Sequence, residues 1–382
     1  MATILVLGGG VGGLVAASEL RQRLGREHRV VLVDRERQHL FAPSLLWLMV
    51  GLRKPEEITR DLASLERKGI QFVQGEVQAI DPSRRTARVN GTSYGADYLI
   101  IALGAQSAPE LVPGLSQAGY NLCSLEGAAA IRDVRKSLTS GRLAALVSRL
   151  PYRCPAAPYE AIMLLAYDCL KRRVRDRVEP AIYSPEPGPM PVAGPQVSAA
   201  VRQLLEERAI SYYPQHQVAE VVAGRTLRFT NGAEAAFDLL VYMPPYVAPQ
   251  VVWEAGLTAE TGWVPVDRHT LETRHPGVYA LGDLTGIPLA TPGLSLPKAG
   301  VFAHRQAEVV AENIAAQIRS EGRTATFDGQ GECFVEVGEG KAGFGRGNFY
   351  ADPRPALQFY NPGRHWHAGK VLVEKNWLRR WF

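Results

Sequence analysis

The sequence predicts an α/β protein with two Rossmann-like doubly wound domains, the second inserted in the first, and a C-terminal section with an amphipathic end. A glycine-rich run follows the first apolar strand, and a buried strand with a proline-containing exit occurs twice. The chain of 382 residues also exceeds one ordinary domain. Its 46% hydrophobic and 21% charged residues are typical of a globular protein.

The N-terminal segment predicts a dinucleotide-binding site. An apolar strand over residues 2–7 leads into Gly8, Gly10 and Gly13, which fit G-x-G-x-x-G, and residues 11–24 have helical apolar spacing. Such glycines permit the turn, the approach of backbone to a pyrophosphate and close helix packing, while the helix N-terminus faces the phosphate charge. Asp34 ends the next strand, where an acid binds ribose hydroxyls. The alternative is a simple glycine-rich turn with an exposed Asp34.

An internal repeat predicts the domain organisation. Residues 97–112 and 238–252 each form a buried strand that exits into a loop containing proline. We therefore expect residues 108–258 to form the second Rossmann-like domain, inserted between residues 1–107 and 259–320 of the first. Residues 321–382 would form the C-terminal section, with strands near 333–337 and 347–350.

Residues 143–160 occupy the place of a second phosphate loop but contain no glycine. They predict a strand, a tight turn and the start of a helix, with Cys154 in the turn. A helix N-terminus stabilises a thiolate, and Pro155 suits the first helical position, so we expect a lowered pKa for the Cys154 thiol. The alternative is that Cys154 is a small buried hydrophobic residue.

Three segments resemble the FAD-contacting segments of the two-dinucleotide-binding flavoprotein superfamily. They are the N-terminal loop, residues 97–105 and residues 278–283. The resemblance implies FAD as the cofactor, with an acid at the ribityl-phosphate region, backbone near the adenine and a proline beside the isoalloxazine ring. The residues implied beyond the N-terminal loop are Pro43, Val77, Gly104, Gly282, Asp283 and Lys298. Lys298 has the alternative interpretation of a solvated lysine at a helix start.

The cysteines carry a closer resemblance. The run Arg153-Cys-Pro-Ala-Ala-Pro-Tyr-Glu160, with Cys123 before it and Cys333 in the C-terminal section, resembles sulfide:quinone oxidoreductase, a relative of the flavocytochrome c sulfide dehydrogenase flavoprotein. The resemblance implies that Cys154 and Cys333 form a redox couple beside the flavin, that Glu160 accepts a proton, and that quinone reoxidises the flavin from its opposite face. The segment 365–378 also resembles the C-terminus of that family.

Alternatives stay open at the individual site residues. Three interpretations of Cys123 are open: a third thiol that handles sulfur, a site of covalent flavin attachment, or a residue without a chemical role. Cys333 has the alternative of a core residue, and Cys169, on an apolar helix, is predicted to be structural. Family histidines near the first cysteine and in the second domain are replaced here by Gly127 and residues 190–195, which leaves the proton acceptor open.

The C-terminal residues 371–382 mix basic and aromatic side chains, a composition that suits a membrane interface. The alternative is a helix docked on the protein's own surface. We expect no membrane-spanning helix and no secretory signal, and hence a peripheral protein on the cytoplasmic side of the plasma membrane. Tyr360, Trp366 and Trp377 are candidates for lining a quinone path.

The predicted function is FAD-dependent oxidation of sulfide to polysulfide or sulfur through the cysteine pair, with electrons passed to membrane quinone. The alternatives are a type II NADH:quinone oxidoreductase and a non-catalytic flavin electron-carrier subunit. The absence of C-x-x-C gives no indication of a metal site, and the modest net charge of +5 gives none of a nucleic-acid partner. The expected partners are sulfide, quinone and a membrane surface, and homo-oligomer formation is left open.

Overall fold

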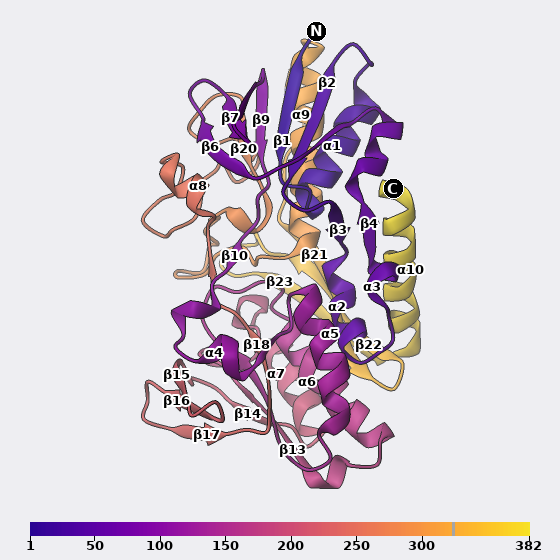
Figure 1. Ribbon diagram of the computed structural model, residues 1–382, viewed down its shortest axis with the longest axis vertical. Helices are drawn as coiled ribbons and strands as arrows, with labels where there is room; N and C mark the ends of the chain where they lie inside the picture. The colour runs from indigo at the N-terminus through magenta and orange to yellow at the C-terminus, as the bar shows by residue number, and fades with distance from the viewer. Residues whose placement is uncertain (323–324) are drawn as a thin grey trace.

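The computed structural model describes residues 1–322 and 325–382 (Figure 1). Its first sheet is parallel and five-stranded, in the order β20-β9-β1-β2-β5. The strands are β1 (Thr3–Leu7), β2 (Arg29–Asp34), β5 (Gln71–Gln74), β9 (Tyr98–Ile101) and β20 (Val278–Ala280). The helices α1 (Val11–Arg23) and α9 (Gly300–Ile318) pack together and share one apolar core with the sheet, because their buried faces consist of small and aliphatic residues.

A smaller antiparallel sheet covers the other face of the first sheet. It consists of β6 (Val77–Asp81), β7 (Thr86–Val89) and β8 (Thr92–Gly95). The helix α8 (Gln250–Glu254) packs against β6, and Val252 and Leu257 join the core of this face with Leu5 and Leu7. The chain therefore returns to the first domain before residue 258, earlier than the sequence predicts. The cause is that the proline-containing loop after the repeated strand already crosses between the domains.

The second sheet repeats this plan in the order β11-β18-β12-β13-β14, again with parallel pairing. Its strands are β11 (Tyr120–Asn121), β12 (Gly141–Val147), β13 (Val178–Tyr183), β14 (Ser211–Tyr213) and β18 (Leu239–Met243). The helices α5 (Leu125–Val134), α6 (Ala157–Lys171) and α7 (Pro195–Glu206) contribute to its core, and a three-stranded sheet β15–β17 lies nearby (Val218–Val222, Thr226–Phe229, Glu234–Ala236). The predicted α/β fold class with two Rossmann-like units is confirmed.

Short elements join and complete the two units. The strands β10 (Gln106–Ser107) and β19 (Tyr246–Val247) pair antiparallel where the chain crosses between them, with α4 (Leu115–Ala118) after the first crossing. Between β2 and β5 lie β3 (Gln38–Leu40), a 3-10 turn (Ala42–Ser44), α2 (Leu45–Met49), α3 (Pro55–Ile58), β4 (Thr59–Asp61) and a second 3-10 helix (Leu62–Lys68). The segment between β2 and β5 therefore supplies the region around the predicted Pro43 contact.

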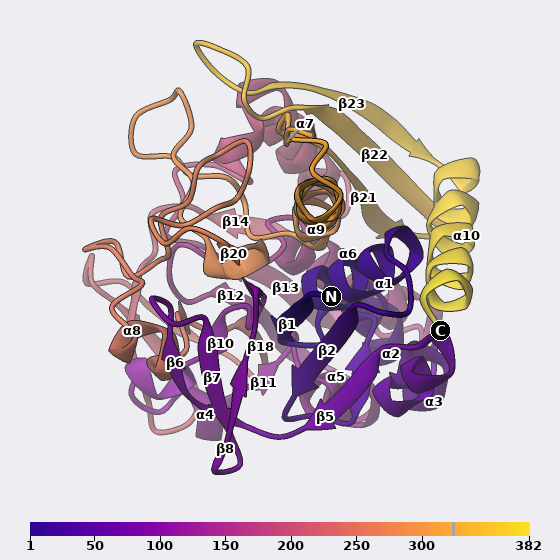
Figure 2. The ribbon, with the colours of Figure 1, turned by 90° about the horizontal axis from the view of Figure 1, so that it is seen from above.

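The C-terminal section is an antiparallel sheet followed by a long helix. It consists of β21 (Gln330–Gly338), β22 (Lys341–Asn348), β23 (Ala356–Gly363) and α10 (Arg364–Trp381). Figure 2 shows the sheet curving past α9 toward α10, and β21 packs on α6 of the second domain. The expected strand near 347–350 is displaced, since β22 ends at Asn348. Because β22 is rich in glycine, a search for alternating apolar residues does not predict it.

The terminal helix α10 docks on the protein's own surface, against β22 and α1. Trp381 is fully buried, and Trp377 stacks on His39 with a centroid distance of 5.0 Å. The large apolar side chains that α10 leaves exposed are Leu372 and Val373, at 59% and 48%. The aromatic end expected at a membrane interface is therefore engaged within the protein. Within the described residues, no helix combines the length and apolar content needed to span a bilayer.

Candidate active site

The N-terminal loop forms a cradle that fits a dinucleotide. Gly8 has φ +104°, and a Cβ there would lie 2.4 Å from the Ala102 carbonyl oxygen. A Cβ on Gly13 would lie 1.8 Å from the carbonyl oxygen of Gly8, whereas one on Gly10 would meet no protein atom within 4 Å. Gly8 and Gly13 are thus required by the fold, while Gly10 borders open space at the N-terminus of α1. Helix N-termini favour the binding of phosphate groups in general.

The other predicted cofactor contacts gather at the same edge of the first sheet. Asp34 ends β2, and its carboxylate accepts a hydrogen bond from the Gly9 amide. Gly104 follows β9, and Gly282 and Asp283 follow β20. Because these strands are parallel, their carboxyl ends form the crevice where such sheets bind ligands. Val77 begins β6 close to Asp34, since the Gly75 amide donates to the Asp34 carbonyl oxygen at 2.8 Å.

Asp283 and Lys298 are held in place by neighbouring groups. The Asp283 carboxylate lies 2.8 Å from Nε of Arg153, in a salt bridge between the two domains. The Lys298 ammonium donates to the Asp283 carbonyl oxygen at 2.7 Å and lies 3.3 Å from the centroid of the Trp263 ring. Burial lowers the pKa of Lys298 to about 7. With 6% exposure, Lys298 is not the solvated lysine of the alternative interpretation.

Cys154 lies in a turn that rests on the first domain. Its amide donates to the Lys298 carbonyl oxygen at 2.7 Å, and its own carbonyl oxygen accepts from the Ala157 amide at 2.8 Å. Cys154 has φ +48°, in the left-handed region. The helix α6 begins at Ala157, so the prediction that Pro155 occupies its first position is wrong. The left-handed residue bends the chain and delays the helix, and Pro158 takes the place in the first turn.

Cys154 and Cys333 meet in the site as two free thiols, and the Cys333 thiol donates to the carbonyl oxygen of Phe334 at 3.2 Å. Interaction with the Cys333 thiol lowers the pKa of Cys154, against the opposing effect of burial. The same interaction, together with burial, raises the pKa of Cys333 well above its usual value. Of the two thiols, Cys154 is therefore the one that ionises first as the pH rises. The cause is mainly the second thiol rather than the helix N-terminus.

Glu160 is buried beside this pair and forms an ion pair that the sequence did not predict. Its Oε2 lies 2.7 Å from Nζ of Lys370 on α10 and accepts from the Glu336 amide at 2.8 Å. Burial raises the pKa of Glu160, and Lys370 opposes that shift. The Glu160 carboxylate acts on Cys154 through its field, raising the thiol pKa, while the Lys370 ammonium lowers it. No sequence spacing signals Lys370, because it lies 210 residues from Glu160.

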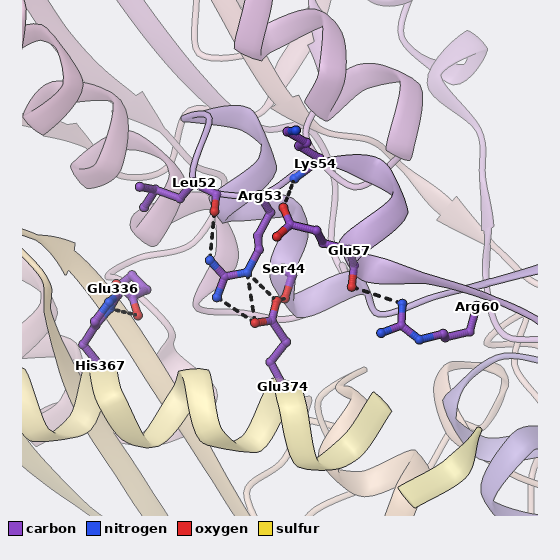
Figure 3. A network of polar contacts seen from close by, with 9 residues as sticks. All are labelled: Ser44, Leu52, Arg53, Lys54, Glu57, Arg60, Glu336, His367 and Glu374. Atoms are coloured by element: carbon purple, nitrogen blue, oxygen red, sulfur yellow. Dashed lines mark hydrogen bonds and ion pairs between the residues drawn. The ribbon is translucent and has the colours of Figure 1, made fainter. Parts of the chain in front are cut away.

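Polar side chains of α10 contact both the segment that follows Pro43 and strand β21 (Figure 3). Glu374 accepts hydrogen bonds from the Ser44 hydroxyl at 2.6 Å and from Arg53. About two turns toward the N-terminus of α10, His367 Nδ1 lies 3.0 Å from the buried Glu336 carboxylate. Polar side chains thus hold α10 in position against the rest of the protein. A sequence search for apolar helix faces does not predict these contacts.

Cys123 lies near Cys154 but has a different environment. Its sulfur is 3.3 Å from the Met243 sulfur, and burial raises its pKa to about 11. Cys123 therefore stays protonated at neutral pH, and its pKa is shifted in the opposite direction from that of Cys154. Cys169 is 2% exposed on α6, as expected of a structural cysteine.

The three aromatic candidates for a quinone path lie in two separate groups. Trp366 stacks on Phe344 with a centroid distance of 4.5 Å, and Tyr360 lies 5.6 Å from Trp366. Trp377 instead lies 5.2 Å from Phe41, next to the Pro43 segment. The aromatic residues do not form one continuous path, and Trp377 is the candidate nearest the predicted cofactor.

Comparison with known proteins places the chain in a family. The sulfide-quinone reductase of Aquifex aeolicus (strain VF5) is 28% identical over 396 residues, which cover 98% of this chain and 90% of that protein. The mitochondrial sulfide:quinone oxidoreductase of Mus musculus is 24% identical over 373 residues, covering 93% and 80%. The X-ray structure of the Aquifex aeolicus sulfide:quinone oxidoreductase superimposes with a TM-score of 0.91 at 25% identity, covering 100% and 91%. Residues 2–147 and 176–307 match the model described as pyridine nucleotide-disulphide oxidoreductase, and the chain belongs to that family.

Proposed function

We propose that this protein is a sulfide:quinone oxidoreductase, an FAD enzyme that oxidises sulfide and reduces a quinone. The observation that carries the proposal is the pair of interacting free thiols Cys154 and Cys333, because the Cys154 turn is bonded directly to the Lys298 segment of the cofactor domain. A disulfide between these two cysteines can accept two electrons, which is the number that the oxidation of one sulfide to the level of elemental sulfur releases.

FAD is the cofactor. The proposed pyrophosphate contacts are Gly10 and the N-terminus of α1, and Asp34 is placed to bind the ribose hydroxyls. Asp283, Gly282 and Gly104 are proposed contacts at the carboxyl ends of the neighbouring strands. Bound there, FAD would supply a two-electron acceptor for the cysteine pair that quinone can reoxidise.

The unequal thiols suggest which cysteine receives the sulfur. In the oxidised pair, hydrosulfide attacks the disulfide, one S–S bond breaks and another forms, and the products are a persulfide and a thiolate. The thiol of lower pKa leaves more readily, so Cys154 departs as thiolate and Cys333 carries the persulfide. A second hydrosulfide removes the outer sulfur as polysulfide. Closure of the disulfide releases two electrons, and the balance is two hydrosulfides to one hydrogen disulfide anion, one proton and two electrons.

Glu160 is the proposed acceptor of that proton. It is buried near both thiols, and burial raises its pKa, which favours uptake of a proton by this carboxylate. Lys370 holds the anionic form between turnovers through its 2.7 Å contact. This assignment does not need the histidines that family members carry and that are replaced here.

The sequence and structure disfavour the NADH-dependent alternative. The turn after β12 contains Pro151 and Tyr152 in place of the glycines that let backbone approach a pyrophosphate. A non-catalytic flavin electron-carrier subunit would have no use for the thiols of Cys154 and Cys333. The protein is therefore proposed to accept electrons from sulfide and not from a nicotinamide nucleotide.

Contact with a membrane surface, on its cytoplasmic side, is also part of the proposal. Leu372 and Val373 are exposed on α10, and the same helix contributes Lys375 and Arg379 to the lining of an open cavity of about 940 Å³. Basic groups beside exposed apolar ones suit an anionic bilayer surface. Flotation with anionic vesicles tests this contact: Leu372→Asp with Val373→Asp should abolish co-flotation, whereas the matched exposed pair Leu111→Asp with Leu170→Asp should not.

Steady-state turnover tests the function itself. The holoenzyme is mixed anaerobically with a short-chain quinone and either sulfide or NADH. Quinone reduction with sulfide and none with NADH is the expected result. Turnover with NADH alone would contradict the proposal.

A further inference from the structure

A buried carboxylate in the second domain has three hydroxyl partners and no part in the chemistry described so far. Glu186 follows β13 and is 3% exposed. Its Oε2 accepts hydrogen bonds from the hydroxyls of Tyr159 at 2.6 Å, Tyr152 at 2.9 Å and Ser184 at 3.0 Å. Three hydroxyl donors therefore converge on one buried carboxylate oxygen.

Neutral donors alone stabilise this group. Across residues 1–322 and 325–382 no salt bridge reaches Glu186, although a buried carboxylate normally requires a charged partner. Burial raises the pKa of Glu186, and the hydrogen bonds from Tyr159, Tyr152 and Ser184 oppose that shift. Loss of any one hydroxyl would therefore disturb the remaining contacts, since a buried acceptor is costly to leave unpaired.

Glu186 occupies the place in the second domain that Asp34 occupies in the first. Asp34 ends β2, the strand beside β1, and faces the glycine loop that follows β1. Glu186 comes just after β13, the strand beside β12, and its partner Tyr152 lies in the loop that follows β12. Where the first loop offers a backbone amide and open space at Gly10, the second offers buried phenol side chains. The protein's own residues thus fill the space of a second nucleotide.

The cluster is joined directly to the turn that carries Cys154. Tyr152 lies two residues before Cys154, and its hydroxyl is also 3.3 Å from the Pro155 carbonyl oxygen. The left-handed conformation of Cys154 is unfavourable for a residue with a Cβ and persists only where surrounding contacts impose it. On the first-domain side those contacts are the Arg153–Asp283 salt bridge and the Cys154–Lys298 backbone bond. On the second-domain side the contact is Tyr152 with Glu186.

We propose that Glu186 is a positioning residue for Cys154, acting through Tyr152, and that this carboxylate–phenol cluster has replaced a nucleotide as the ligand of the second Rossmann unit. The cluster keeps the Cys154 sulfur beside the Cys333 thiol and so maintains the interaction between the two groups. The proposal rests on the proposed function for its effect on turnover, but its effect on the Cys154 thiol is independent of substrate.

The test compares Tyr152→Phe with wild type in the FAD holoenzyme. After mild reduction, alkylation of the Cys154 peptide by iodoacetamide is followed by mass spectrometry from acid to alkaline pH. Tyr152→Phe keeps the ring but loses both hydroxyl contacts, so the alkylation midpoint should move to higher pH. The rate of flavin reduction by sulfide should fall about tenfold, as expected for one lost hydrogen bond to a carboxylate, while reoxidation by quinone stays unchanged.

Two further variants separate positioning from general destabilisation. Glu186→Gln retains an oxygen that accepts hydrogen bonds from the hydroxyls, so its Cys154 alkylation midpoint should stay near that of wild type. Glu186→Ala has no such oxygen, and its midpoint should move to higher pH. Tyr183→Phe, at a ring that stacks on Tyr213 away from the cysteine turn, should leave the midpoint unchanged. An unshifted midpoint in Tyr152→Phe would overturn the proposal, even where its melting temperature falls. Failure of sulfide to reduce the wild type would instead overturn the proposed function and leave the alkylation result valid.

Discussion

The ammonium of Lys370 lies 2.7 Å from Oε2 of Glu160, and both side chains are almost fully buried. This ion pair joins the terminal helix α10 to α6 beside the cysteine pair. Its position means that the last part of the chain contributes charge directly to the site. The Lys370 ammonium favours the Cys154 thiolate, and the Glu160 carboxylate opposes it.

Breaking the ion pair from one side should be costly. Lys370→Met leaves the Glu160 carboxylate buried without a cation, and we expect the free energy of unfolding to fall by about 3–5 kcal/mol in urea titrations. The double variant Glu160→Gln with Lys370→Met removes both charges and should recover most of that loss. Strictly additive losses would show that the two side chains do not interact in the folded protein.

The thiolate character of Cys154 should depend on a hydrogen-bond donor at position 333. Cys333→Ala removes the donor, so the pKa of Cys154, measured by the pH dependence of its alkylation, should rise. Cys333→Ser keeps a hydroxyl donor and should preserve most of the lowered pKa. Equal pKa values in the two variants would mean that another group stabilises the thiolate.

Gly10 should be required for FAD and not for the fold. A Cβ at Gly10 meets no protein atom within 4 Å, so Gly10→Ala should leave the melting temperature of the cofactor-free protein near that of wild type. The affinity for FAD, measured by calorimetry, should fall at least tenfold, because the methyl group stands where the pyrophosphate approaches. Gly13→Ala should destabilise even the cofactor-free protein, since its Cβ would lie 1.8 Å from a carbonyl oxygen. Unaltered FAD affinity in Gly10→Ala would place the cofactor elsewhere.

Lys298 should make stability depend on pH. Burial lowers its pKa to about 7 from an ordinary value of 10.5. Between these values the unfolded chain binds more protons, so the free energy of unfolding rises with pH across this window and the contribution is lost as the pH falls through 7. Lys298→Met should flatten this rise. Lys341→Met, which removes a surface partner of Glu339, should not.

The sequence predicts the parts of the site that depend on local pattern. One strand–loop–helix pattern predicts Gly8, Gly10, Gly13 and Asp34, and a second such pattern predicts the turn at Cys154. Each pattern lies within about 35 residues of chain, the scale of one βαβ unit. The approach of Cys333 to Cys154 followed only from a family resemblance. Nothing local indicates Lys370 or Glu186, because their partners come from elements that only the folded chain brings together.

Sequence patterns also do not predict where α6 begins or where the chain returns to the first domain. A proline after Cys154 favours a helix start, but the left-handed backbone of Cys154 outweighs that preference. The helix α8 is too short to show apolar periodicity, and its place beside β6 is decided by packing of Val252. Tertiary contacts, rather than propensity, set both boundaries.

Anaerobic reduction of the FAD holoenzyme, monitored by its flavin absorbance, tests the role of Cys154 most directly when wild type is compared with Cys154→Ser. Sulfide should bleach the wild type and NADH should not, and Cys154→Ser should retain FAD but lose bleaching by sulfide. Bleaching of Cys154→Ser at the wild-type rate, or rapid bleaching of the wild type by NADH, would contradict the central claim that this thiol receives the electrons of sulfide.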